Sequence, residues 1–300
     1  MLRVWLDGKM ITYKDAKVPI LTHSLQYGSG IFEGMRAYEA KRGTAIFRLD
    51  DHMQRFQRSA KIYSMRMRYS AKELAKACAQ VVKANRFSSC YIRPFIFYNT
   101  DDIGVGIWNG VTSVYIAAVP FGAYYGAGKE KGIRCKISSW RRINSSILPV
   151  EAKSSGNYNN SIISNNEARA SGFDETILLS VDGYVAEGAA ENIFLVKYGH
   201  LITPGASADI LMGITRDSII KIAESIGLIV EEREVHKEEL YSADEVFFCG
   251  TAAEITPVVN IDGISVGNGK PGPITKLLTQ KYTEVVTGQN REFIDWLTYV

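Results

Sequence analysis

Apolar runs and turn signals divide the first 120 residues into short strands and two helices. Residues 1–8 are typical of a strand that enters an Asp7-Gly8 turn, and a second strand follows this turn. A helix opens at Arg48, with acidic residues in its first turn, and another is expected from about Ala71 to Asn85. Two later apolar runs predict strands of an antiparallel sheet: 91–98 and 112–119.

The rest of the chain mixes strands and helices without a regular strand–helix–strand repeat. Asp182-Gly183 separates two apolar segments and is a strong hairpin signal. The expected strands are 133–138, 175–180, 184–187, 192–196 and 246–249, and the expected helices are 159–170, 215–227 and 274–286. This irregular order predicts an α+β fold rather than a doubly wound parallel sheet.

A change in composition indicates where the chain divides. Residues 120–132 are small, flexible and mostly without periodicity, and they predict an interdomain loop. A chain of 300 residues is too long for one ordinary domain. We therefore expect an N-terminal domain over residues 1–119 and a larger C-terminal domain over residues 133–300.

The bulk composition excludes several classes of protein. Charged residues make up 22% of the chain and the net charge is only +3, so neither nucleic acid nor an anionic membrane is expected as a partner. No apolar run approaches the ~20 residues that cross a bilayer. The four cysteines lie far apart without a CxxC pair, which favours free thiols and a soluble cytoplasmic protein without a metal site.

Two short motifs match known patterns without the context that those patterns need. Residues 267–272 fit GxGxxG, but a turn and a proline-started helix follow instead of a βαβ unit. Residues 263–267 fit GxSxG, but the last histidine, His236, precedes the serine, whereas a hydrolase needs a later one. Neither dinucleotide binding nor a hydrolase triad is predicted.

Lys153 is the main candidate for a catalytic residue because of the residues around it in the sequence. It lies among small residues in Glu151-Ala-Lys-Ser-Ser-Gly-Asn-Tyr158, just before a polar helix. A lysine taken alone is usually a solvated surface residue. The functional interpretation therefore depends on what the rest of the chain contains.

The segment around Lys153 resembles the cofactor-lysine segment of fold-type IV pyridoxal-5′-phosphate (PLP) enzymes, specifically the branched-chain aminotransferases. Six further segments resemble family segments in family order: 27–36, 48–53, 91–94, 187–192, 213–217 and 250–257. The resemblance covers almost the whole chain. It implies a two-domain fold like that of D-amino acid aminotransferase, with a small α/β domain and a larger domain that has a β-barrel-like core.

The resemblance also assigns the cofactor site. Lys153 would carry PLP as a Schiff base and shuttle the substrate proton, and Glu187 would keep the pyridine nitrogen protonated. Tyr158 would bind the phenolic oxygen of the cofactor. Arg48, Ile214, Thr215 and Thr251 would hold the phosphate, the middle two through N–H groups at a helix start. Without the resemblance, Gly213-Ile-Thr is equally an ordinary capped helix start.

The substrate residues follow in the same way. Tyr91 and the N–H groups of Thr251 and Ala252 would hold the substrate carboxylate, and Arg93 would receive the distal carboxylate of glutamate. Two residues apart on one strand, Tyr91 and Arg93 share a face. The apolar pocket would use Phe32, Tyr27 and Val105, with Tyr124 contributed by a neighbouring subunit. Core packing is the alternative interpretation of these aromatic residues.

The implied activity is transamination between L-leucine, L-isoleucine or L-valine and 2-oxoglutarate, in a homodimer or higher homo-oligomer. Other fold-type IV activities stay open: D-amino acid transaminase, (R)-amine transaminase and aminodeoxychorismate lyase. A PLP-binding homologue without turnover is a further alternative. Two segments depart from the family pattern: residues 107–110 lack an Asn-Pro-type loop, and Phe121 stands where relatives often have Trp.

Overall fold

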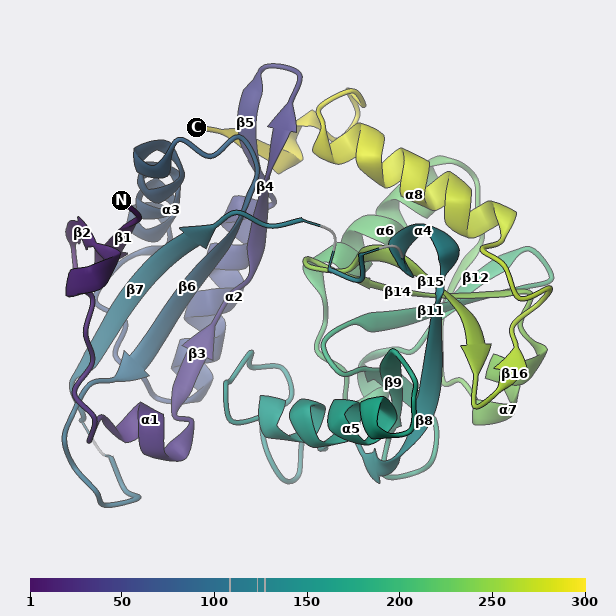
Figure 1. Cartoon of the computed structure of the whole chain (residues 1–300), viewed down its shortest axis with the longest axis horizontal. Helices are drawn as coiled ribbons and strands as arrows, with labels where there is room; N and C mark the ends of the chain where they lie inside the picture. Colours follow the sequence, from purple (N-terminus) through teal and green to yellow (C-terminus); the bar gives the residue numbers. More distant parts are fainter. Residues whose placement is uncertain (108, 123, 127) are drawn as a thin grey trace. The chain divides into compact units, whose positions relative to one another are not determined.

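The computed structural model describes residues 1–107, 109–122, 124–126 and 128–300. The chain forms two compact units (Figure 1). The first comprises Met1–Phe121, Ala152–Gly156 and Glu284–Val300, and the second comprises Gly122–Glu151 and Asn157–Thr283.

The first unit is built on an eight-stranded antiparallel sheet. Its strands follow the order β17-β5-β4-β6-β7-β1-β2, with β3 paired to β6. Their bounds are β1 Arg3–Leu6, β2 Lys9–Thr12, β3 Gly30–Phe32, β4 Met35–Ala40, β5 Gly43–Phe47, β6 Cys90–Tyr98, β7 Thr112–Val119 and β17 Leu297–Tyr299. The short helices of this unit are α1 (His23–Tyr27) and the 3-10 turns Tyr13–Asp15 and Ile294–Trp296.

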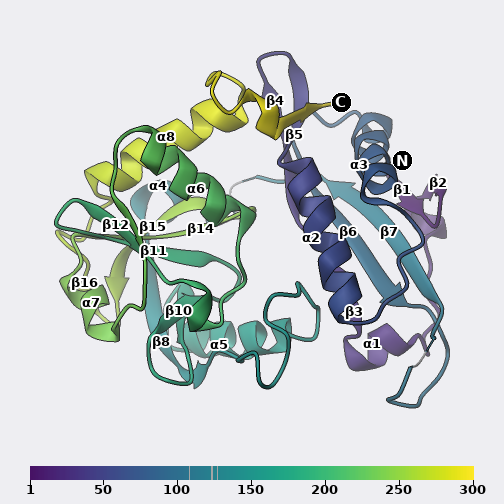
Figure 2. The same ribbon diagram turned by 180° about the vertical axis from the view of Figure 1, so that it is seen from behind.

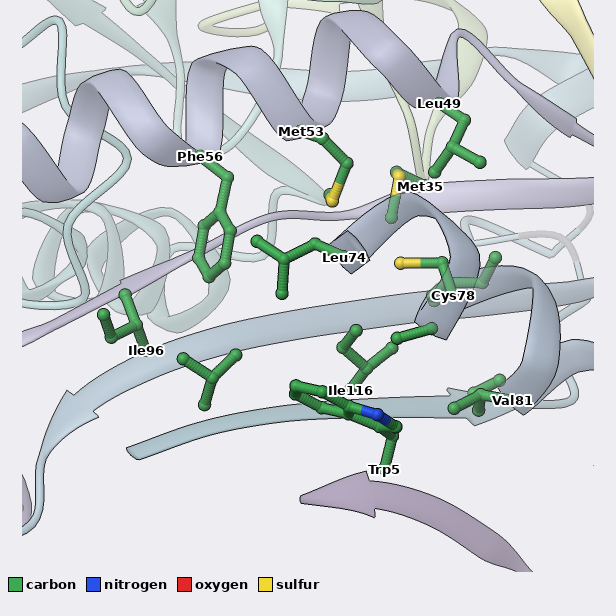
Figure 3. Close-up of a cluster of buried hydrophobic side chains, with 14 of the residues drawn as sticks. Trp5, Met35, Leu49, Met53, Phe56, Leu74, Cys78, Val81, Ile96 and Ile116 are labelled. Carbon is green, nitrogen blue, oxygen red and sulfur yellow. The ribbon is translucent and has the colours of Figure 1, made fainter. Parts of the chain in front are cut away.

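Two helices cover one face of this sheet, α2 (Leu49–Ile62) and α3 (Ala71–Asn85) (Figure 2). In α2 the buried apolar residues recur at helical spacing, with Leu49, Met53 and Phe56 on one stripe. Figure 3 shows Met53 and Phe56 directed toward Leu74 of α3, above the sheet residues Ile96, Ile116 and Trp5. The stripe fixes the rotation of α2 and thereby the directions of its polar side chains.

The second unit contains a closed barrel. Its nine-stranded sheet follows the order β10-β9-β8-β15-β14-β11-β12-β13, with β16 paired to β15. An additional pairing of β10 with β11 closes six of these strands into a ring. β8 pairs in parallel with both β9 and β15, and β12 with β13, while the remaining pairs are antiparallel. The bounds are β8 Ile133–Arg141, β9 Glu175–Leu179, β10 Val185–Gly188, β11 Asn192–Lys197, β12 His200–Thr203, β13 Val230–Glu232, β14 Glu245–Gly250, β15 Glu254–Ile261 and β16 Ile264–Ser265.

Helices pack on the outside of the barrel. α5 (Tyr158–Ala170) contacts β8 and β9, and α6 (Ile214–Ser225) contacts β14, as Figure 2 shows from behind. α8 (Pro273–Val286) starts on the buried Glu245 carboxylate, which accepts hydrogen bonds from the N–H groups of Ile274 and Thr275. The short helices are α4 Gly128–Lys131, α7 Lys237–Ser242 and a 3-10 turn at Ala206–Ala208.

The α+β class and the barrel-like core agree with the expectation from the sequence. The division of the chain differs from the expected one in two segments. Residues 152–156 belong to the first unit because Ser154 bridges to Ile31 and the Ser155 N–H donates to Gly30 at 2.8 Å. Residues 284–300 also belong there because β17 adds to the edge strand β5. Both are long-range backbone pairings, which local patterns do not reveal.

No helix within the described ranges is long and apolar enough to span a membrane. The same residues contain no group of His, Cys, Asp and Glu side chains that could hold a metal ion. Each of the four cysteines is a buried free thiol.

Candidate active site

In the first unit, the backbone around Lys153 is fixed between β3 and α2. The Lys153 N–H donates to the Ser59 hydroxyl at 3.1 Å, and its carbonyl accepts from the Phe32 N–H at 3.0 Å. The chain before β3 approaches closely, since a Cβ on Gly28 would lie 3.3 Å from the Gly156 Cα. Gly28 also has a φ of 65°, which glycine adopts without strain. The position of Lys153 is thus set by backbone contacts.

The Lys153 ammonium lies in surroundings that favour its neutral form. Its side chain is partly buried, and Nζ lies 5.0 Å from the centroid of the Phe32 ring. Burial, together with the nearby positive charge of Arg55, lowers the pKa of Lys153 from 10.5 to about 8. The amine is therefore neutral in a sizeable fraction at a pH near 8, which is the nucleophilic form that Schiff-base chemistry needs.

A buried charge network that the sequence did not indicate lies close to this lysine. Glu33 is fully buried and accepts from Arg55 through both carboxylate oxygens, at 2.6 and 2.9 Å, and from His52 Nδ1 at 2.7 Å. Burial alone would raise the pKa of Glu33, but Arg55 and His52 outweigh it and hold that pKa well below its usual range. The available signal was the i, i+3 spacing of His52 and Arg55 on one helix face.

Tyr91 and Arg93 lie on the same face of β6, as predicted. Arg93 Nη2 donates to the Tyr91 hydroxyl at 3.0 Å, and the Arg93 guanidinium lies 4.5 Å from the Phe32 ring centroid. Among the described residues no ion pair involves Arg93, and its buried Nε has no hydrogen-bond acceptor. Lys153 and Arg93 therefore approach one aromatic ring, and Arg93 has capacity left for an anion.

Gly34 provides the room that Tyr91 occupies. A Cβ on Gly34 would lie 1.9 Å from the Tyr91 hydroxyl oxygen, far inside van der Waals contact. The Tyr91 ring also contacts the Phe121 ring, with centroids 5.2 Å apart. No other residue at position 34 allows this placement of the tyrosine.

The structure places three further predicted residues of the first unit as follows. Arg48 has a left-handed backbone (φ 51°), pairs with Asp51 at the start of α2 and stacks on Trp296 at 4.7 Å. Tyr27 is exposed and donates to the Ile103 carbonyl at 2.6 Å. Val105 is 78% exposed. Trp108, in the atypical loop, lies outside the described residues.

In the second unit, Glu187 lies where the barrel closes. It is paired with Asn192 across β10 and β11. Its carboxylate lies 2.7 Å from Arg142 Nε and accepts from the Asn192 amide at 3.2 Å and the Leu211 N–H at 3.3 Å. The pattern of the strands gave no indication of Arg142 or Asn192 as partners. They hold Glu187 as an oriented, ionised carboxylate inside the protein.

The start of α6 offers N–H groups to an anion. Its N-cap residue is Gly213, which makes no side-chain cap, and no protein acceptor binds the N–H groups of Ile214 and Thr215 in the part of the chain that the structure describes. A Cβ on Gly213 would lie 2.0 Å from Asn192 Oδ1. The glycine therefore allows the helix start to pack against the amide that holds Glu187.

Thr251 and Ala252 form part of the three-residue turn that joins β14 to β15, with Gly250 paired to Glu254. Because Asn192 is paired with Cys249, this turn lies at the same end of the barrel as Asn192. Both residues are partly buried. Tyr158, also partly buried, is the first residue of α5, and Tyr124 is 50% exposed.

The chain belongs to the class IV aminotransferase family, whose model matches residues 30–261. It is 46% identical to the branched-chain-amino-acid aminotransferase of Escherichia coli strain K12, covering 99% of this chain and 97% of the relative. The crystal structure of the branched-chain aminotransferase from the archaeon Thermoproteus uzoniensis with norvaline matches with a TM-score of 0.95 at 46% sequence identity. The match covers 99% of this chain and 98% of that chain. The crystal structure of the branched-chain amino acid aminotransferase from Thermobaculum terrenum in its PLP form matches with a TM-score of 0.93 at 35% sequence identity. The match covers 99% of this chain and 97% of that chain.

Class IV aminotransferases depend on PLP. The donor groups of this chain fit that cofactor. Lys153 supplies an amine with a lowered pKa, Glu187 supplies a buried carboxylate, and the start of α6 supplies N–H groups without protein acceptors among the described residues. These are the three kinds of group that the aldehyde, the pyridine nitrogen and the phosphate of PLP require.

Gly34→Ala tests whether Tyr91 needs the space at position 34. The added methyl group should displace the tyrosine hydroxyl from Arg93, because the two cannot share the space. We expect the KM for amino acid substrates to rise roughly tenfold or more, the cost of losing a hydrogen bond to a charged group. Gly205→Ala is the control, since a Cβ there meets open space. Unchanged steady-state kinetics in Gly34→Ala would exclude this role.

Proposed function

We propose that this enzyme transfers the amino group of L-leucine, L-isoleucine or L-valine to 2-oxoglutarate, giving the branched-chain 2-oxo acid and L-glutamate. The observation that carries the proposal is the placement of Arg93 and Lys153 against one ring, Phe32. An apolar surface with a guanidinium beside it suits both a branched aliphatic chain and a distal carboxylate. The names of the relatives support the same substrates.

PLP, when bound, withdraws electrons from the substrate so that the Cα proton becomes acidic. The residues proposed to hold it are Lys153, Tyr158, Glu187, Ile214, Thr215 and Thr251. Arg48 belongs to the same set. Its guanidinium is buried and has the planar fork that suits phosphate oxygens, whereas Arg55 is already paired with Glu33 through two of its nitrogens.

Lys153 is the group that moves the proton. Its amine is neutral in a sizeable fraction at a pH near 8, so it can accept a proton at Nζ and return it. Phe32 lies against the amine and limits its access to water. Glu187 has a separate role, because it supplies a fixed negative charge that favours a protonated ring nitrogen, with Arg142 and Asn192 fixing its orientation.

Substrate recognition divides between the two carboxylates of glutamate. Tyr91, with the N–H groups of Thr251 and Ala252, is proposed to hold the carboxylate common to every substrate. Arg93 receives the distal one, and Phe32 contacts the aliphatic chain of leucine instead. Because Arg93 lies flat on an aromatic ring, it presents an apolar face and polar edge groups in one place.

The proposal includes a homodimer in the cytoplasm. Tyr27, Val105 and Tyr124 were predicted to line the substrate pocket, yet each is largely exposed in the single chain. Exposed neighbours of the same kind lie close to Tyr27 and Val105 in sequence: Ile20, Leu21, Leu25 and Ile103. A second copy that covers this apolar surface of the first unit would give Tyr27 and Val105 the buried surroundings that a substrate pocket needs.

The overall reaction can be tested with the purified enzyme. Purified enzyme with L-leucine and 2-oxoglutarate should form L-glutamate and the branched 2-oxo acid, while D-alanine should be a poor donor. L-Leucine alone should abolish the visible absorption of the bound cofactor, because the cofactor then keeps the amino group. Lys153→Ala should lose both signals. Faster turnover with D-alanine would contradict the proposal, and a cofactor that binds without any turnover would indicate a non-catalytic homologue.

The role of Arg48 at the phosphate is tested with matched lysine variants. Arg48→Lys keeps the positive charge but loses the planar fork that suits phosphate oxygens. We expect its affinity for PLP to fall about tenfold in a titration of the cofactor-free protein, as for one charge-assisted hydrogen bond. Arg58→Lys, which alters an exposed arginine of α2, should bind PLP as the unmodified enzyme does. An unchanged affinity in Arg48→Lys would count against Arg48 as a phosphate ligand.

Arg93→Ala separates the two half-reactions. Removing the guanidinium should slow the glutamate half-reaction on the order of 100-fold, because two charge-assisted hydrogen bonds are lost. The leucine half-reaction should change far less, since leucine presents no distal charge. Single-turnover rates with each amino acid give the comparison, and Arg93→Lys should recover part of the glutamate rate. Equal losses with both substrates would count against this role.

A further inference from the structure

Two buried carboxyl groups of the second unit share one phenol hydroxyl. Tyr125 Oη lies 2.9 Å from Glu175 Oε2 and 2.9 Å from Glu191 Oε1. Both glutamates are almost completely buried, with exposures of 2% and 4%. Neither has an ion-pair partner among the described side chains, in contrast to Glu33 and Glu187. The bridge therefore buries two acid groups without a neutralising cation in contact.

The number of hydrogens available determines the protonation of this bridge. A phenol carries one hydrogen and can donate it to one carboxylate only. If both glutamates were ionised, the Tyr125 oxygen would donate its hydrogen to one carboxylate. It would then lie 2.9 Å from an oxygen of the other carboxylate with no hydrogen between the two atoms. One carboxyl group must therefore carry a proton and donate it to the Tyr125 oxygen.

The neighbouring donors indicate that Glu191 carries this proton. Glu175 accepts two further hydrogen bonds, from the Asn165 amide and the Thr176 N–H, and both favour its ionised form. Glu191 accepts one, from the Ala190 N–H at 3.0 Å. The chain of hydrogen bonds then runs from the Glu191 carboxyl to Tyr125 and from Tyr125 to the Glu175 carboxylate.

Burial and the neighbouring carboxylates favour the same retained proton. Burial, followed by the charge of Glu175, raises the pKa of Glu191 from 4.5 to about 8, and Glu187 adds to this shift. Burial also raises the pKa of Glu175, which Arg169 opposes. Burial and both carboxylates raise the pKa of Tyr125 far above its usual range, so its hydroxyl stays protonated. The thiols of Cys135 and Cys249, which also face the pair, have raised pKa values and stay neutral.

The bridge ties together two segments of the proposed site. Glu191 is the last residue of the three-residue turn between β10 and β11, and its carbonyl accepts from the Gly188 N–H at 2.7 Å. Glu187 and Asn192 pair across the two strands that this turn joins. On the other side, Tyr125 is next to Tyr124 in the segment that follows β7. Fixing Tyr125 on Glu191 thus restrains both segments.

We propose that Tyr125, Glu175 and Glu191 form a proton-sharing clasp that positions the β10–β11 turn, with Glu187 at its start, and holds residues 124–126 against the barrel. They are positioning residues, and their effect on catalysis rests on the proposed function of Glu187 and Tyr124. Loss of the shared proton leaves two facing carboxylates around a single phenol hydrogen and opens the clasp.

The sign of the pH dependence follows from the retained proton. Between pH 4.5 and about 8 the folded protein keeps a proton on Glu191 that the unfolded chain releases. The stabilisation is complete below pH 4.5 and is lost as the pH rises through 8. Glu33, whose pKa is lowered, has the opposite dependence, but its contribution is constant above its ordinary pKa of 4.5.

The test compares the melting temperature (Tm) of the cofactor-loaded enzyme across this pH range. Glu191→Gln replaces the protonated acid with an amide that donates to Tyr125 at every pH. Glu175→Gln removes the negative charge of Glu175, so that an ionised Glu191 can accept the Tyr125 hydrogen and no shared proton is required. Each variant should lose the decline in Tm between pH 4.5 and 8 that the unmodified enzyme shows. Tyr125→Phe should lower the Tm below pH 8 and speed tryptic cleavage after the exposed Lys131. Tyr198→Phe, which alters an exposed tyrosine, should do neither.

Activity adds a separate readout. Glu191→Gln should keep its kcat above pH 8, where the unmodified enzyme loses it, whereas Tyr125→Phe should have a lowered kcat below pH 8. The Tm and cleavage results decide the clasp even if no transamination is found, so its failure is distinct from failure of the proposed function. Equal pH dependence of Tm in the unmodified enzyme and both glutamine variants would overturn the proposal. So would a Glu191→Gln variant that melts earlier than the unmodified enzyme at low pH.

Discussion

The cost of burying charge is the constraint on which the rest of this structure depends. A carboxylate inside a protein needs a cation, several donors or a proton. Glu33 is compensated by Arg55 and His52, and Glu187 by Arg142 with two N–H donors. Glu191 keeps a proton. Each solution produces a different charge state from the same kind of side chain, which is the variety that a site for acid–base chemistry needs.

These charge states are fixed by backbone geometry. The Lys153 carbonyl and N–H are both engaged by the first unit, so only the flexible part of the side chain can respond to a substrate. Glu187 lies on the strand pair that closes the barrel, where a shift in register would move it to the other face. Two glycines set the spacing: Gly34 admits the Tyr91 hydroxyl, and Gly213 admits the Asn192 amide.

The sequence predicted the parts of the fold that are locally encoded. The helix at Ala71–Asn85 and the hairpin at Asp182-Gly183 follow from periodicity and turn chemistry, and both are present. The pairing of β17 with β5 and the closure of β10 on β11 are long-range contacts without a local signal. At the site, the shared face of Tyr91 and Arg93 followed from strand geometry. Arg55 and Tyr125 could not be found, because only their tertiary partners distinguish them from ordinary helix and loop residues.

The proposed recognition of two kinds of substrate by Arg93 follows from how its guanidinium is held. A guanidinium that lay without contacts in an apolar pocket would repel a leucine side chain through the cost of its desolvation. Here its planar face packs on Phe32 and Tyr91, so its charge is partly compensated by the two rings before any substrate binds. A carboxylate still gains hydrogen bonds at the edge of the plane, and an aliphatic chain loses little. In the proposed function, one side chain in this way serves both half-reactions.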